Sequence, residues 1–259
     1  MKKQVRTNIV LVIVMTCLAL AIGLVFVWLE LGAASLTEEL SSNSAVATET
    51  TTEPEISSLS ENTSPEPVVI PPEFHLAVPF TTQAPWSNWG QPYQDACEEA
   101  AVLNVHYFYE GKTFTKEIAD REILDFVDFE NSYLGFYRST TAAELVDVTK
   151  AYLGYDRIDI LEDPTVDDIK AQVAAGRPVI VPAAGRELGN PFFTQPGPIY
   201  HMYVIRGYDQ NNFYTNDIGI GRGENYVYDI DVVMSSISDW DGVGNLSREK
   251  RVIVIYPNK

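Results

Sequence analysis

The chain has 259 residues, with 18 Lys and Arg against 36 Asp and Glu, and it contains only two cysteines. It is therefore too long for a small domain held together by disulfides, and its net charge of −18 excludes a protein that binds nucleic acid through a basic surface. The same negative charge opposes adsorption to an anionic membrane surface.

The first predicted element is a membrane-spanning helix over residues 9–29. These 21 residues contain no charged side chain, and a helix of this length crosses a hydrocarbon core about 30 Å thick. Three basic side chains precede the span and glutamates follow it, so the positive-inside rule places residues 1–8 in the cytoplasm and the remainder outside the cell membrane. A cleaved signal peptide ending near the small residues 32–34 is the alternative. Its apolar core would exceed the usual length of about 7–15 residues, so we expect an uncleaved, single-pass signal anchor.

The next segment, residues 30–73, is predicted to be a disordered linker. It contains 14 Ser and Thr, nine Glu and five Pro, but no aromatic residue. Such a composition cannot bury enough apolar surface to offset the entropy lost on ordering. We expect an extended acidic stalk between the membrane and a folded domain.

Residues 74–259 are predicted to form one globular domain of ordinary size. Its first part contains a short strand near residues 75–80, a helix over 97–109 capped by Asp95, a helix-rich aromatic segment up to residue 140, and two capped amphipathic helices within 140–154 and 165–176. Its second part contains β-branched or aromatic runs, which predict strands joined by turns within 177–184, 201–209, 212–218, 224–230 and 250–258. Helices followed by an antiparallel sheet indicate the α+β class.

Cys97 is the most informative residue of this domain, because Cys17 lies in the predicted membrane span. A lone cysteine is often a small buried apolar residue. Here it lies at the predicted start of a helix, where the free N–H groups and the helix dipole favour a thiolate. Glu98 and Glu99 oppose a thiolate, so a positively charged partner is needed.

The candidates for that partner are His75, His106 and His201. His106 follows Cys97 by nine residues and therefore lies on the opposite face of the same helix. His75 has no polar neighbours in the sequence. His201 begins a predicted strand whose hairpin partner carries Asn216 and Asp217, an arrangement in which a third group can orient a base.

Strand pairing leaves two choices for that third group. If the connecting loop is residues 209–211, Asp217 shares a face with His201. If the loop is residues 209–212, Asn216 takes that place, because a shift of one residue exchanges the two faces of a strand. A carboxylate stabilises an imidazolium better than an amide does, so Asp217 is preferred while Asn216 remains the alternative.

Five segments in this order, VPFTTQ, DACEEA, GRPVIVPAAG, HMYVIRGYD and YTNDIG, give the region from residue 78 to about 257 a family resemblance. It resembles the papain-like cysteine peptidase family 39, whose better-studied members process bacteriocins and are fused to ABC transporters. The chain has no GxxxxGK[ST] motif, so it is similar to solitary relatives without a transporter. The resemblance implies a papain-like fold, with the nucleophile at a helix N-terminus and the antiparallel sheet in the second half.

The resemblance also implies the site residues. Cys97 would be the nucleophile, His201 the general base and acid, and Asp217 the residue that orients the imidazole. The oxyanion-hole glutamine would be Gln83, which ends VPFTTQ. The 13 residues between Gln83 and Cys97 leave Gln91 and Gln94 as competitors.

The predicted function is therefore that of a membrane-anchored, extracytoplasmic cysteine peptidase acting on a peptide or protein substrate, with no cofactor and no metal. The cysteines and histidines show no zinc-ligand spacing. One alternative is a non-catalytic peptide-binding module on the same scaffold. Another is a cell-wall amidase or acyltransferase with the same chemistry, since one fold hosts many specificities.

Overall fold

A computed structural model describes residues 69–258 of the chain. The predicted cytoplasmic tail, the predicted membrane helix and residues 30–68 of the predicted linker lie outside the described residues. Within residues 69–258, none of the helices has both the length and the apolar character needed to cross a membrane. The elements, in chain order, are β1 (Phe74–His75), η1 (Tyr93–Asp95), α2 (Cys97–Tyr109), α3 (Lys116–Leu134), α4 (Ala142–Leu153), β2 (Ile158–Glu162), α5 (Val166–Ala174), β3 (Val179–Ala184), η2 (Gly185–Leu188), β4 (Tyr200–Tyr208), β5 (Asn212–Asn216), β6 (Tyr226–Asp229), α6 (Ile230–Ser236) and β7 (Arg251–Ile255).

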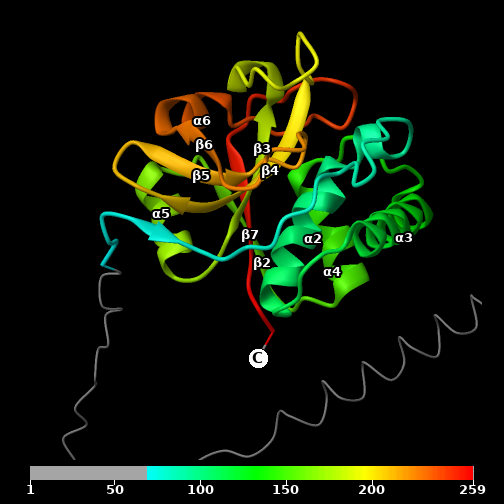
Figure 1. The fold of residues 1–259 in the computed structure, drawn as a ribbon, viewed down its shortest axis with the longest axis horizontal. Coiled ribbons are helices and arrows are strands. Elements are labelled where there is room, and N and C mark those ends of the chain that lie inside the picture. The colour runs from blue at the N-terminus through cyan, green and yellow to red at the C-terminus, as the bar shows by residue number, and fades with distance from the viewer. Residues whose placement is uncertain (1–68, 259) are drawn as a thin grey trace, which may run out of the picture. The chain divides into compact units, whose positions relative to one another are not determined.

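The strands form one antiparallel sheet in the order β2-β7-β3-β4-β5-β6, with β1 paired to the far end of β4. Helices α2, α3 and α4 gather on one side of the domain, and α5 and α6 lie with the sheet on the other (Figure 1). The predicted α+β class with an antiparallel sheet is therefore confirmed.

The two faces of the sheet bury separate hydrophobic clusters, because successive side chains of a strand point to opposite faces. On β4, Met202 and Val204 pack with the helices α2–α4. The alternate residues Tyr203 and Ile205 pack on the other face, in the cluster that also contains α5 and α6 side chains. A strand buried on both faces accounts for the nearly continuous apolar run of β4.

The predicted helix 97–109 is confirmed as α2, but its predicted cap is wrong. Asp95 ends the short helix η1, and Ala96 is the N-cap residue of α2, with no side-chain hydrogen bond to the helix. The caps of the next predicted helices are confirmed. Thr141 and Thr165 each accept a hydrogen bond from the backbone three residues later and form capping boxes that begin α4 and α5.

Four elements were not predicted: the short helices η1 and η2, strand β2 and helix α6. Strand β2 pairs with β7 at one edge of the sheet, and its partly exposed residues 159–162 do not show the alternation expected of a half-buried strand. Helix α6 has only seven residues and directly follows β6. Both are too short or too mixed in character for periodicity to identify them.

The β4–β5 hairpin resolves the pairing question in an unexpected way. Its loop has four residues, because Tyr208 pairs with Phe213. A β-bulge at Arg206 then adds one residue to β4, so that Ile205 pairs with Thr215 and Val204 with Asn216. The bulge reverses the effect of the even loop and returns Asp217 to the face of His201.

Candidate active site

Cys97 is the first residue of α2, at the end of the helix where backbone N–H groups lack helical partners. Its side chain is 7% exposed. The thiol donates a hydrogen bond to Oε2 of Glu98 over 2.9 Å. The sulfur is also close to β4, because the backbone of Met202, the residue after His201, lowers the pKa of the thiol.

The electrostatic surroundings favour the protonated thiol. Burial raises the pKa of Cys97 well above its usual range, and the negative charge and hydrogen bond of Glu98 raise it further. The backbone of Met202 acts in the opposite direction and lowers the pKa. The thiol is therefore favoured over the thiolate while Glu98 is ionised.

His201 and Asp217 form a buried pair. Nε2 of His201 lies 2.8 Å from Oδ1 of Asp217, and the two side chains are 2% and 0% exposed. His201 is the second residue of β4, and Asp217 directly follows β5. Because Asp217 occupies Nε2, Nδ1 is the ring nitrogen left for a further partner.

Asp217 receives three more hydrogen bonds, which keep it ionised. The backbone N–H of Gly219 donates to Oδ1 over 3.1 Å. Nδ2 of Asn190 and the hydroxyl of Tyr228 donate to Oδ2 over 3.0 Å and 2.6 Å. Burial acts to raise the pKa of Asp217, but the charge of His201 and these hydrogen bonds outweigh it, and the pKa lies below its ordinary value.

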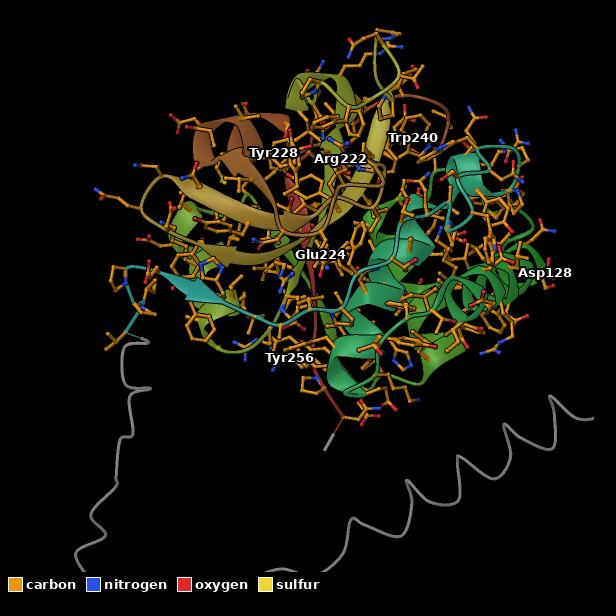
Figure 2. The ribbon with its side chains drawn as sticks, in the orientation of Figure 1. Asp128, Arg222, Glu224, Tyr228, Trp240 and Tyr256 are labelled. Carbon is orange, nitrogen blue, oxygen red and sulfur yellow. The ribbon has the colours of Figure 1, made fainter. Side chains whose placement is uncertain are left out.

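The loops around the imidazole leave it little freedom. A Cβ atom on Gly219 would lie 2.7 Å from Cε1 of His201, so only glycine fits there without a shift. Phe193 packs edge-on against the ring, with centroids 5.3 Å apart. Tyr228, labelled in Figure 2, lies in the sheet half, whereas Asp128 marks the helical half on α3.

The three candidate oxyanion glutamines lie in different surroundings. Gln83 is 4% exposed, and its Nε2 donates to the carbonyls of Tyr93 and Gln94 over 2.9 Å and 3.2 Å. Gln83 is thereby held against η1, immediately before Cys97. Gln91 and Gln94 are exposed, and the amide of Gln91 contacts Asp95 and Tyr137.

The other residues considered from the sequence lie elsewhere. Asn216 points to the helical face, where its Nδ2 donates to Oδ1 of Asn104 over 3.1 Å. His106 pairs with the hydroxyl of Tyr155 over 2.9 Å. His75 lies in β1 against the ring of Tyr214. Within residues 69–258, the side chains of these three residues form no hydrogen bond with Cys97, His201 or Asp217.

Sequence reasoning missed Asn190, Gly219 and Tyr228. Tyr228 could have been found, because Phe213 pairs with Tyr228, and Phe213 and Asp217 share a face of β5 and its continuation. Asn190 lies in a loop with no pattern that relates it to Asp217. Gly219 follows β5 in a turn, and nothing in the sequence shows that it lies against the imidazole of His201.

The arrangement contains the parts needed for nucleophilic acyl transfer: a thiol at a helix N-terminus, and an imidazole oriented by an ionised carboxylate from a neighbouring strand. In the part of the chain from 69 to 258, no three His, Cys, Asp or Glu side chains are grouped so that they could hold a metal ion.

The match to a protein-family model agrees with this chemistry. The family model described as "Peptidase_C39 like family" matches residues 75–247. The fold is similar to a structure from Bacillus anthracis described as a C39-like peptidase, with 16% identity, a TM-score of 0.47, and coverage of 72% of this chain and 99% of that one. It is also similar to Xylellain, a cysteine protease from Xylella fastidiosa, with 13% identity, a TM-score of 0.48, and coverage of 74% and 88%. No protein with a curated description matches the chain. The family of this chain is established by the match of residues 75–247 to the family model alone.

Proposed function

Because this chain belongs to the Peptidase_C39 like family and is a cysteine peptidase of that family, we propose that it hydrolyses peptide bonds with Cys97, His201 and Asp217 as its catalytic triad. The family implies a peptide or protein as the substrate. The roles are those expected from the sequence, with Cys97 as the nucleophile, His201 as the base and then the acid, and Asp217 as the orienting carboxylate.

In the first half of the reaction, the S–H bond of Cys97 breaks and its proton moves to Nδ1 of His201, since Asp217 already occupies Nε2. The thiolate then forms a C–S bond with the carbonyl carbon of the substrate. When the tetrahedral intermediate collapses, the C–N bond breaks and the imidazolium gives its proton to the leaving amine. In the second half, His201 takes a proton from water, which cleaves the thioester and restores the thiol.

The developing oxyanion needs hydrogen-bond donors, which supply several kcal/mol in enzymes of this kind. The backbone N–H of Cys97 is one candidate, because it lies at the unpaired end of α2. The amide of Gln83 is the other, because it is buried beside η1, next to the start of that helix. Its Nε2 donates to the carbonyls of Tyr93 and Gln94, so one of these two hydrogen bonds must be exchanged for the one to the oxyanion.

The observation that carries the proposal is the His201–Asp217 pair. Its Nε2–Oδ1 distance of 2.8 Å, its burial and the four donors to the carboxylate fix one orientation of the imidazole. A surface histidine that served only for solubility would need none of these contacts.

Iodoacetamide labelling of Cys97 at pH 6 tests the proposal without knowledge of the substrate. We expect rapid labelling that is lost in His201→Ala, together with hydrolysis of a peptide library that is lost in Cys97→Ala. Peptide mapping separates Cys97 from Cys17. Slow labelling that is the same in both proteins would refute the triad.

A non-catalytic peptide-binding module remains the second candidate, and one observation favours it. Burial and Glu98 raise the pKa of the Cys97 thiol, which opposes nucleophilic attack. This candidate predicts peptide binding that survives Cys97→Ala and is accompanied by no hydrolysis. The labelling experiment above separates the two candidates.

The proposed place of the enzyme is the outer side of the cell membrane, on a single N-terminal anchor. The support is the uncharged stretch of residues 9–29 between basic and acidic flanks. In intact cells, an added protease should then remove residues 74–259 while the tail before residue 9 stays protected. Protection of the whole chain would contradict this topology.

A further inference from the structure

Glu98 touches the sulfur on which the proposed reaction depends. It follows Cys97 on α2, its side chain is 1% exposed, and its Oε2 accepts the thiol hydrogen bond over 2.9 Å. Carboxylates are rarely buried unless they are paired or have a function.

The second oxygen of Glu98 is fixed by the backbone. The N–H of Thr140 donates to Oε1 over 3.1 Å, and the Thr140 carbonyl in turn accepts from the hydroxyl of Tyr200 over 3.0 Å. A backbone N–H can only donate, so Oε1 must act as an acceptor. When Glu98 is neutral, its proton therefore lies on Oε2, the oxygen that faces the sulfur.

This geometry gives the contact two states. With Glu98 ionised, the S–H of Cys97 donates to Oε2, and the thiol keeps its proton. With Glu98 neutral, Oε2–H donates to the sulfur and stabilises a thiolate whose own proton has moved to Nδ1 of His201. We propose that Glu98 is a further catalytic residue, which in its neutral form donates a hydrogen bond to the Cys97 thiolate and in its ionised form holds Cys97 as the thiol. This inference rests on the triad proposed above.

The titration of Glu98 makes the change occur near neutral pH. Burial raises its pKa to about 7, against the lowering effects of the Cys97 and Thr140 hydrogen bonds and of His201. Burial also raises the pKa of Glu99 on α2 and of Glu130 on α3, and the charge of Glu130 raises the pKa of Glu99 further. The titratable groups that surround Glu98, directly or through these neighbours, are Cys97 and Glu99 on α2, Glu130 on α3, Glu144 on α4, Tyr200 and His201 on β4, and Asp239 before β7.

The pH profile of Cys97 labelling by iodoacetamide tests the inference in the full-length chain. From pH 6 to pH 8 the wild-type rate should fall by about tenfold or more. Proton transfer from Cys97 to His201 within the pair does not itself depend on pH, whereas ionisation of Glu98 disfavours the thiolate by about tenfold. In Glu98→Gln the amide N–H replaces Oε2–H and the amide oxygen accepts from Thr140. This variant should label at pH 6 within about threefold of wild type and should keep that rate at pH 8.

Glu99→Gln is the matched control, because it removes a buried carboxyl one residue away that has no hydrogen bond to the sulfur in the described structure. It should keep the wild-type fall between pH 6 and pH 8. A wild-type rate that rises steadily with pH, as for an ordinary thiol, overturns the inference and needs no variant. The inference is also overturned if the labelling rate of Glu98→Gln falls with pH as the wild-type rate does, while His201→Ala still abolishes labelling at pH 6. If His201→Ala has no effect, the triad itself fails.

Discussion

Tyr228→Phe removes one hydroxyl from the hydrogen bonds that hold Asp217. That hydroxyl donates to Oδ2 over 2.6 Å and accepts from Nδ2 of Asn190 over 2.7 Å. A hydrogen bond to a charged group contributes about 1.5–3 kcal/mol to stability, and we expect the free energy of unfolding at pH 7 to fall by about 2 kcal/mol. For a urea slope of about 2 kcal/mol/M, this moves the unfolding midpoint down by about 1 M.

The size of this effect should depend on the charge of Asp217. The pKa of Asp217 is lowered in the folded protein, so the stability it contributes is present above its unfolded pKa and is lost as the pH falls through its folded pKa. The difference between the two proteins should therefore be largest at neutral pH. Urea unfolding followed by circular dichroism at pH 7 measures it.

Tyr208→Phe is the matched control for that experiment. The Tyr208 side chain is also fully buried, but its hydroxyl makes no hydrogen bond within residues 69–258. Removing this hydroxyl should leave the free energy of unfolding unchanged or raise it, because a buried hydroxyl without a partner carries a desolvation cost. If Tyr228→Phe were no more destabilising than Tyr208→Phe, the hydroxyl would not hold the carboxylate and our reasoning about Asp217 would be refuted.

Three further predictions concern other contacts. Gly219→Ala should displace the imidazole of His201, because the new Cβ would lie 2.7 Å from Cε1, and should slow Cys97 labelling at pH 6 by about tenfold or more. Glu130→Gln should weaken the pH dependence of stability. Burial raises the pKa of Glu130 to about 8, so the folded state keeps a proton that the unfolded state loses, and wild type loses about 1.4 kcal/mol per pH unit between its unfolded and folded pKa values. Thr141→Ala removes the side-chain acceptor of the α4 capping box and should cost about 1 kcal/mol in urea unfolding.

Each of these has a result that contradicts it. Gly221→Ala is the control for the first, because a Cβ there meets nothing within 4 Å, and equal labelling rates in both glycine variants would remove the steric argument. For Glu130→Gln, urea unfolding is measured at pH 5 and pH 8, and the free energy of unfolding should fall less in the variant than in wild type. An equal fall in both proteins would contradict the raised pKa of Glu130. For Thr141→Ala, unchanged stability would mean that the cap contributes nothing.

The fold class and the helix that carries Cys97 were predictable because they depend on local patterns. The apolar and β-branched runs of the second half define strands, and Thr residues followed by acidic residues define helix starts. Strand β2 and helix α6 were missed because their patterns are short. Asp95 failed as a cap because the chain forms η1 before α2, a tertiary preference that capping statistics do not contain.

The site was predictable only as far as strand pairing reaches. The prediction placed Asp217 on the face of His201 by assuming a loop with an odd number of residues between β4 and β5. In the structure the loop is even, and the bulge at Arg206 supplies the additional residue that brings Asp217 to the same face. The contacts of Asn190 and of Thr140 come from loops, whose course periodicity does not describe. The buried position of Glu98 was hidden because acidic residues in a first helical turn are usually explained by the helix dipole.

The bulge at Arg206 couples the length of a surface turn to the chemistry of the site. If the strand kept Arg206 but formed a regular ladder from the Tyr208–Phe213 pair onwards, Ile205 would lie opposite Asn216, and the residues after β5 would change faces. An asparagine would then meet the imidazole in place of an aspartate. The carboxylate therefore reaches the imidazole only because the ladder is interrupted at Arg206, a position outside the site.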